Sequence, residues 1–164
     1  MQCIKSGGAV SDEYYMQQAL REAHKALDAG EVPIGAVVVM NNSIIGRGHN
    51  QVETLHDATA HAEMIAVTAA FNHLGAKYLP GATIYVTLEP CLMCCGALYW
   101  SKITTLVFGA ADPKHGGISL YRKTSGANGL SPKNLPLHPQ TVLRSGILSE
   151  ESLQLMKQFF HSKR

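Results

Sequence analysis

The sequence has no apolar run approaching the ~20 residues that a membrane-spanning helix needs. Its first ten residues, Met1 to Val10, also lack the apolar segment of a secretory signal. We therefore expect a cytoplasmic protein without a membrane association. Gly7 and Gly8 indicate that residues 1–10 form a flexible tail, and residues 11–164 fit one domain with room for a sizeable core.

Cysteines are few, and three of the four (Cys91, Cys94 and Cys95) fall within five residues. They lie too close together to staple a small secreted fold. In a chain without an export signal, such a cluster is more typical of metal binding or catalysis than of disulfides. We expect these thiols to be reduced.

The formal net charge is only +2, but the charge is unevenly distributed. Residues 1–113 hold 6 Lys/Arg and 10 Asp/Glu, a balance of −4, whereas residues 114–164 hold 8 Lys/Arg and 2 Asp/Glu, a balance of +6. A basic C-terminal third suits a polyanionic partner. An ordinary solvated surface explains the same charges equally well.

The order of periodic segments predicts an α/β protein. Helical patterns cover residues 12–29, after the N-cap candidate Ser11, and residues 61–74, 91–101 and 150–160; β-rich runs cover residues 36–40, 44–49, 83–87, 105–108 and 141–143. Residues 54–60 read as a loop, and residues 110–140 as a long loop that is functional, disordered or partly helical. We expect a three-layer αβα sandwich, a mixed five-stranded sheet with helices on both faces.

The residues that indicate chemistry are His61-Ala62-Glu63 and Pro90-Cys91-Leu92-Met93-Cys94, each at the start of a predicted helix. Cys91 and Cys94 are three apart, so both thiolates can reach one ion. Two cysteines and one histidine make three zinc ligands, whereas a structural zinc site normally has four. The count therefore indicates a catalytic zinc with a position left for water.

Glu63 is predicted to act beside the metal without binding it. In the first turn of a helix, it and His61 can lean toward the same site beyond the helix end. A carboxylate there suits a proton shuttle that takes a proton from water and delivers it to a ring nitrogen. Cys95 lies about 100° around the helix from Cys94 and is interpreted as a small core residue.

The pattern His-x-Glu followed by Pro-Cys-x-x-Cys is the signature of zinc base deaminases. The resemblance extends further: the chain resembles the bacterial tRNA adenosine deaminases of the cytidine/deoxycytidylate deaminase superfamily. Similar segments are Glu31 to Val37, Thr59 to Glu63, Leu79 to Gly96, Val107 to Ala110 and Phe159-Phe160. The resemblance covers roughly residues 12 to 112 and the final helix.

The resemblance implies a cytidine deaminase-like fold, a homodimer, and one zinc ion per subunit. Its implied zinc ligands are His61, Cys91 and Cys94, with Glu63 as the catalytic proton shuttle. It also implies that the substrate is contacted by Asn50, Ala62, Asp112, Lys114, Phe159 and Phe160. The expected reaction is hydrolysis of adenosine to inosine at the wobble position, in the anticodon loop of an arginine tRNA.

Two other functions fit the same residues. The first is deamination of a free base such as guanine or cytosine, because residues 119–140 depart from the family pattern and Tyr99-Trp100 is similar to guanine deaminases. The second is a non-catalytic, zinc-stabilised RNA-binding module. This second function requires a fourth protein ligand, for which His56 and Cys95 are the candidates.

Overall fold

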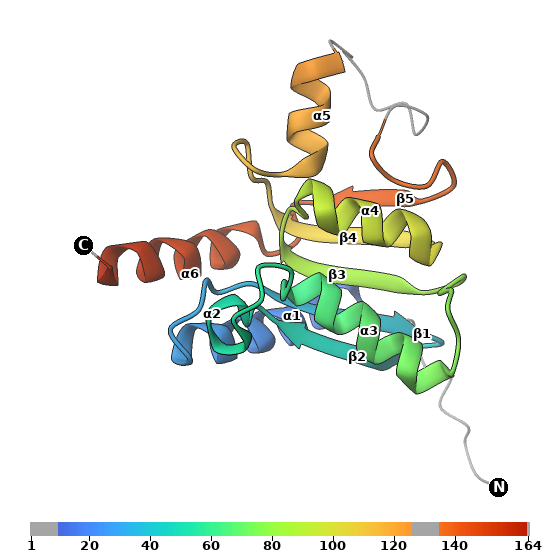
Figure 1. The fold of residues 1–164 in the computed structure, drawn as a ribbon, viewed down its shortest axis with the longest axis horizontal. Helices are drawn as coiled ribbons and strands as arrows, with labels where there is room; N and C mark the ends of the chain where they lie inside the picture. Colours follow the sequence, from blue (N-terminus) through green and yellow to red (C-terminus); the bar gives the residue numbers. More distant parts are fainter. Residues whose placement is uncertain (1–9, 126–134, 164) are drawn as a thin grey trace, which may run out of the picture.

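The computed structural model describes residues 10–125 and 135–163 (Figure 1). The predicted flexible tail, residues 1–10, lies outside these residues except for Val10. Part of the predicted long loop, residues 126–134, also lies outside them. No helix in the described ranges combines the length and apolarity that crossing a bilayer requires.

The described residues form one mixed sheet. Its strands are β1 (Gly35–Met40), β2 (Ser43–His49), β3 (Thr83–Leu88), β4 (Thr105–Ala110) and β5 (Val142–Ser145), in the order β2-β1-β3-β4-β5. Strand β1 pairs antiparallel with β2 and β3, whereas β3, β4 and β5 run parallel. The predicted mixed five-stranded sheet is confirmed.

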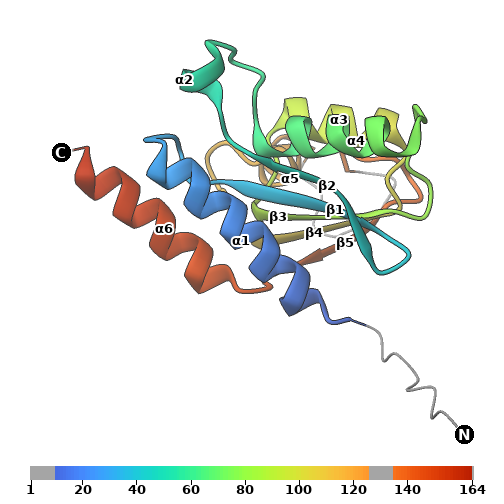
Figure 2. The ribbon, with the colours of Figure 1, turned by 90° about the horizontal axis from the view of Figure 1, so that it is seen from below.

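Helices cover both faces of this sheet, which confirms the three-layer αβα arrangement. Figure 2 shows α1 (Asp12–Asp28) and α6 (Ser149–Ser162) on one face, and α3 (Ala62–Leu74) and α4 (Leu92–Ser101) on the other. One apolar core fills the space between the sheet and α3 and α4. A second core lies between the sheet and α1.

Local sequence signals explain several of these boundaries. The side chain of Ser11 accepts a hydrogen bond of 3.2 Å from the backbone N–H of Tyr14, as an N-cap should. Asn41 and Asn42 both have positive φ, 50° and 59°, between the paired residues Met40 and Ser43. They form a two-residue turn that matches the twist of a β-hairpin.

Two further helices overlap the predicted loops, the longer of which was expected to be functional, disordered or partly helical. The short helix α2 (Val52–Leu55) overlaps the predicted loop 54–60, which corrects that prediction. The second helix, α5 (Gly117–Ser125), lies within the long segment 110–140, so that segment is partly helical. In Figure 1, α5 projects beyond α4 at the β5 side of the sheet.

Candidate metal centre and active site

Two helix N-termini meet at one end of the sheet. His61 is the N-cap residue of α3, and Cys91 is the N-cap residue of α4, three residues after the end of strand β3. Helix α3 packs closely on β2, because a Cβ atom at Gly48 would lie 2.4 Å from the carbonyl oxygen of Ala62. Glycine at this position therefore allows the first turn of α3 to approach the sheet.

The side chains of His61, Cys91 and Cys94 form a compact group. The Nδ1 atom of His61 lies 3.6 Å from the Sγ atom of each cysteine, and the three ligand atoms all lie within 4.8 Å of one another. Tetrahedral zinc, bound to sulfur at about 2.3 Å and to nitrogen at about 2.0–2.1 Å, places those two atoms about 3.5 Å apart. The donor set and its spacing fit zinc.

The electrostatics of the two thiols also suit a metal. A hydrogen bond from Cys94 lowers the pKa of Cys91 to about 4; burial opposes this change, and hydrogen bonding to His61 adds to it. The hydrogen bond to Cys91, together with burial, raises the pKa of Cys94. Metal binding displaces such a proton, because thiolate is the ligand form.

No fourth ligand joins this group among residues 10–125 and 135–163. The Cys95 thiol instead approaches the carbonyl oxygen of Pro90 at 3.6 Å, and burial raises its pKa to about 12. His56 follows the short helix α2 as its C-cap residue. Neither Cys95 nor His56 therefore joins the three ligands to complete a four-ligand structural site. The burial of Cys95 agrees with its interpretation as a core residue.

Glu63 lies beside the three ligands in the first turn of α3 and is only 5% exposed. Burial raises the pKa of its carboxyl group to about 7, although the backbone N–H of Glu63 and the nearby His61 act in the opposite direction. A carboxyl group with a pKa close to neutrality can both accept and return a proton.

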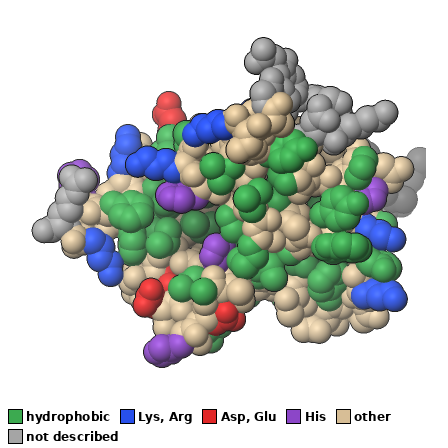
Figure 3. Space-filling model, turned by 45° about the horizontal axis from the view of Figure 1, so that its top comes forward, with side chains coloured by type: hydrophobic (Ala, Val, Ile, Leu, Met, Phe, Trp, Pro, Cys, Tyr) green, Lys and Arg blue, Asp and Glu red, His purple; other side chains and the backbone are tan. Residues whose placement is uncertain are grey.

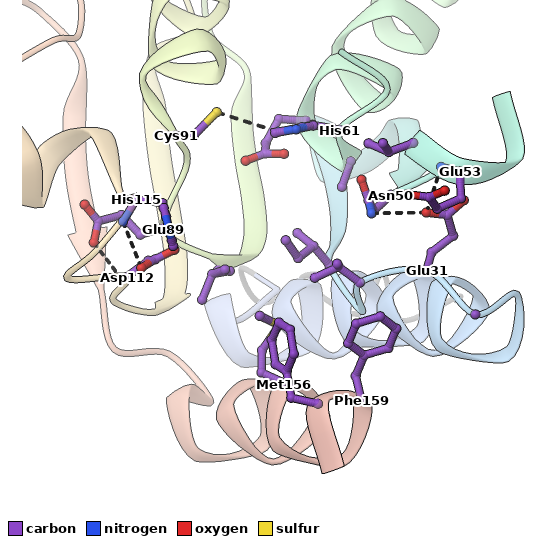
Figure 4. A pocket seen from close by; sticks show the side chains of 18 of the residues that line it. Glu31, Asn50, Glu53, His61, Glu89, Cys91, Asp112, His115, Met156 and Phe159 are labelled. Carbon is purple, nitrogen blue, oxygen red and sulfur yellow. Dashed lines mark hydrogen bonds and ion pairs between the residues drawn. The ribbon is translucent and has the colours of Figure 1, made fainter. Parts of the chain in front are cut away.

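A cavity of ≈ 450 Å³ opens in front of this group (Figure 4). Five predicted substrate-contacting residues line it: Asn50, Ala62, Asp112, Phe159 and Phe160. The sixth, Lys114, does not line this cavity. It lines a neighbouring hollow that shares Leu88, Asp112, His115, Met156 and Phe160 with the first.

These residues differ in exposure and in their contacts. Phe159 is 7% exposed and packs into the wall, whereas Phe160 is 53% exposed at the cavity mouth. The Asp112 carboxylate accepts hydrogen bonds from the backbone N–H groups of Lys114 and His115, at 3.0 and 3.1 Å. Asp112 therefore shapes its own turn as well as lining the cavity.

Two buried acids, Glu31 and Glu89, also border the cavity, and neither was predicted from the sequence to be a site residue. The Glu89 carboxylate accepts hydrogen bonds from the backbone N–H of Asp112 and from both the backbone N–H and the hydroxyl of Ser119. The sequence offers only a weak signal for either acid. Glu31 precedes an apolar run and Glu89 follows one, but the residues that bond to them lie far away in the chain.

Residues 9–110 match the model of the cytidine and deoxycytidylate deaminase zinc-binding region. The chain belongs to this family. It is 45% identical over 153 residues to a tRNA-specific adenosine deaminase of Bacillus subtilis, covering 93% of this chain and 91% of the relative. The family explains why His61, Cys91 and Cys94 meet where two helices begin.

Two solved structures show the same architecture. One, from work on A-to-I editing by tRNA:A34 deaminases at the wobble position of transfer RNA, has a TM-score of 0.76 and 38% identity, covering 87% of this chain and 98% of that one. The other, a guanine deaminase from Bacillus subtilis, has a TM-score of 0.60 and 33% identity, covering 73% and 71%. The first matches more of this chain, including segments outside the zinc-binding region.

Proposed function

We propose that this chain hydrolyses adenosine to inosine and ammonia at the wobble position of the anticodon loop of an arginine tRNA. The observation that carries the proposal is the arrangement of Glu63, which borders the cavity beside three metal ligands without joining them. A metal site with three protein ligands and a free acid beside it suits hydrolysis. Similarity to tRNA-specific adenosine deaminases over most of the chain supports the substrate.

The protein residues divide the work of the reaction. When bound, zinc supplies Lewis-acid activation of the attacking water. As the oxygen of that water bonds to C6 of adenine, Glu63 accepts one of its protons and delivers it to a ring nitrogen. The second proton of the water then moves to the amino group, the C6–N bond breaks, and ammonia leaves. Asn50, Ala62 and Phe159 line the walls between which the base is held. The base must leave its stack to reach this depth.

The shape of the cavity favours a nucleotide within RNA over a free base. Helix α6 lines one wall with Met156 and Phe159, and the cavity continues past Phe160 into the hollow that Lys114 lines. A free base would leave this second hollow unfilled. Exposed Phe160 can stack on an unpaired neighbouring base, and Lys114 can approach a phosphate.

The test is a deamination assay on an anticodon stem-loop of an arginine tRNA with adenosine at the wobble position. We expect inosine at that position alone, detected by mass spectrometry of the nucleosides, and faster turnover at low salt. A stem-loop with guanosine at the wobble position is the matched control. No inosine, together with ammonia release from free guanine or cytosine, would reject the tRNA substrate.

We further propose that the chain acts as a cytoplasmic homodimer, with residues 11–164 as a single domain after a flexible tail. Support for the dimer comes from exposed apolar side chains on α4 and in the segment between α3 and β3. Tyr78, Leu92, Tyr99 and Trp100 are 38% to 74% exposed, and Figure 3 shows hydrophobic side chains gathered over this face. A face on which exposed apolar side chains gather is typical of a protein interface.

A further inference from the structure

The buried acid Glu31 borders the cavity and contacts Asn50, another residue of its wall. Its side chain is 1% exposed, at the turn between α1 and β1. One carboxylate oxygen accepts hydrogen bonds from the Asn50 amide, at 3.4 Å, and from the backbone N–H of Glu53, at 3.2 Å. The other accepts from the backbone N–H and the hydroxyl of Thr54, at 2.7 and 2.8 Å.

The contact with Glu31 fixes the orientation of the Asn50 amide, while the other three hold the Glu31 carboxylate in place. A carboxylate has no hydrogen to donate, so only the NH₂ end of the amide can face Glu31. Figure 4 shows the Asn50 nitrogen directed at Glu31 and the amide oxygen turned away from it, toward the side where His61 lies.

The oxygen of Asn50 is available to a ligand. No described residue donates a hydrogen bond to it, and no fully buried side-chain nitrogen or oxygen in the described ranges lacks a partner. The oxygen is therefore reached from the cavity that Asn50 lines. At this point the wall offers a hydrogen-bond acceptor, which suits a hydroxyl or a ring N–H on the bound molecule.

We propose that Glu31 is a positioning residue that fixes the Asn50 amide so that the cavity presents an acceptor, and not a donor, to the substrate. The proposal rests on the proposed function, since Asn50 is expected to contact the bound nucleotide. Glu31 itself borders the cavity but acts through Asn50. The polarity of this wall is thus set by a carboxylate nineteen positions before Asn50 in the chain.

The substitution Glu31→Gln separates this role from mere packing. Glutamine keeps the size of the side chain but replaces one acceptor oxygen with a donor NH₂ group. The two bonds from Thr54 are the shorter ones, at 2.7 and 2.8 Å, so the remaining oxygen stays on Thr54 and the new NH₂ group faces Asn50. The Asn50 amide must then turn over and present its NH₂ end to the cavity. The substrate then meets a donor where it needs an acceptor, so we expect kcat/KM to fall about tenfold, the cost of one hydrogen bond.

A double-mutant cycle shows whether the loss passes through Asn50. We expect Asn50→Ala alone to lower kcat/KM about tenfold, and Glu31→Gln to add less than about twofold when Asn50 is already alanine. Independent losses that multiply in the double variant would overturn the proposal. Thr54→Val is the matched control, because it removes one hydrogen bond to Glu31 and leaves Asn50 untouched; it should keep the wild-type kcat/KM.

A measurement without substrate tests the contact between Glu31 and Asn50 whether or not the proposed function is right. In a ¹H–¹⁵N correlation spectrum of the zinc-loaded protein, the side-chain amide pair that Asn50→Ala removes belongs to Asn50. We expect Glu31→Gln to shift this pair and speed its exchange with water, and Thr54→Val to leave it in place. An unchanged pair in Glu31→Gln overturns the proposal even if inosine is formed.

A protein that makes no inosine refutes the proposed function alone, since the spectrum still tests the link between Glu31 and Asn50. If Glu31→Gln does not fold, Glu31→Asp is the second variant. It keeps the charge but withdraws the carboxylate by one methylene, so the Asn50 pair should again shift and exchange faster. An Asn50 pair that stays at its wild-type position in Glu31→Asp contradicts the proposal.

Discussion

The Nδ1 atom of His61 lies 3.6 Å from the Sγ atom of Cys91, although the two residues are 30 positions apart in the chain. The fold produces this approach by beginning α3 and α4 at the same end of the sheet, with each residue at an N-cap. The positive ends of both helices favour negative charge there, which stabilises thiolate ligands.

The first prediction concerns zinc content. Cys91→Ala leaves only His61 and Cys94 as ligands, so we expect the purified variant to lose most of its zinc, measured by plasma mass spectrometry. Cys95→Ala is the matched control, because Cys95 is buried four residues farther along the same helix and contacts the carbonyl oxygen of Pro90. It should keep about one zinc per chain, as the wild type should. Equal zinc in Cys91→Ala and wild type would refute the assigned ligand set.

The second prediction separates the proton shuttle from the ligands. Glu63→Gln keeps the shape of the side chain but cannot accept a proton, so we expect kcat to fall by at least about a hundredfold. Zinc content should be unchanged, because Glu63 is not in the ligand group. Stability should not decrease, since a neutral amide replaces a carboxylate that is 5% exposed.

The control for Glu63→Gln is Glu151→Gln, at an exposed position in the first turn of α6. It removes the same charge from the surface and should leave kcat at the wild-type value. A Glu63→Gln variant that turns over normally would contradict the shuttle, and one that loses its zinc would place Glu63 among the ligands.

The third prediction concerns the buried Glu89, which ties the segment after β4 to the end of β3. Gly116 leaves no room for a side chain there, because a Cβ atom would lie 2.3 Å from the carboxyl carbon of Glu89. Glu89→Ala leaves three donors of Asp112 and Ser119 without their acceptor. We expect it to lower the free energy of unfolding in urea by about 3 kcal/mol.

Ser119→Ala tests the same network more gently. It removes the hydroxyl donor but keeps the backbone N–H that bonds to Glu89, so we expect a loss of about 1 kcal/mol. If both variants unfold at the wild-type urea concentration, the Glu89 contacts contribute nothing to stability.

The zinc ligands could be predicted from sequence because their signals are local. His61 and Glu63 lie at the start of one helix, and Cys91 and Cys94 lie at the start of another. The family pattern then predicts that the two pairs belong to one metal site. The hairpin at Asn41 was equally accessible, because two adjacent asparagines tolerate the positive φ that its turn requires.

The features that sequence analysis missed depend on contacts between distant residues. The N-terminal N–H groups of α2, at Glu53 and Thr54, are capped by Glu31, 22 and 23 positions earlier. The neighbouring sequence therefore contains no cap that would predict the helix. The role of Glu89 is hidden in the same way, since Ser119 is 30 positions away.

The fourth prediction follows from the ionisation of Glu31. Burial alone would raise its pKa, but hydrogen bonds from Thr54 and Glu53 outweigh burial and hold the pKa below its ordinary value of 4.5. A group whose pKa is lowered by folding stabilises the protein above its unfolded pKa, and this contribution is lost as the pH falls through the folded pKa.

We therefore expect wild type to exceed Glu31→Gln in free energy of unfolding by a constant amount at neutral pH. The difference should shrink once the pH falls below about 4.5. Urea unfolding of both proteins at a series of pH values measures this difference in free energy of unfolding. Acid also releases zinc, but this lowers the stability of both proteins and cancels in the difference. A gap that widens as the pH falls would mean that Glu31 is protonated in the folded protein.

The fifth prediction concerns the exposed apolar side chains of α4. Trp100 is 74% exposed, and its ring lies 5.5 Å from that of Tyr99 in an edge-to-face pair. Exposed aromatic rings of this size contribute much of the energy of an interface when a partner covers them. We expect light scattering to give a wild-type mass of about twice 17.7 kDa, and Trp100→Glu to give about 17.7 kDa.

The fold should survive this substitution, because the Trp100 side chain is largely exposed in a single chain and is not part of the apolar core. An unchanged circular dichroism spectrum would verify this. Tyr14→Glu is the matched control, since Tyr14 is 48% exposed on α1, on the opposite face of the sheet. It introduces the same charge at an exposed aromatic residue and should leave the mass of the dimer unchanged. A dimer that persists in Trp100→Glu but dissociates in Tyr14→Glu would move the interface to the face that α1 and α6 cover.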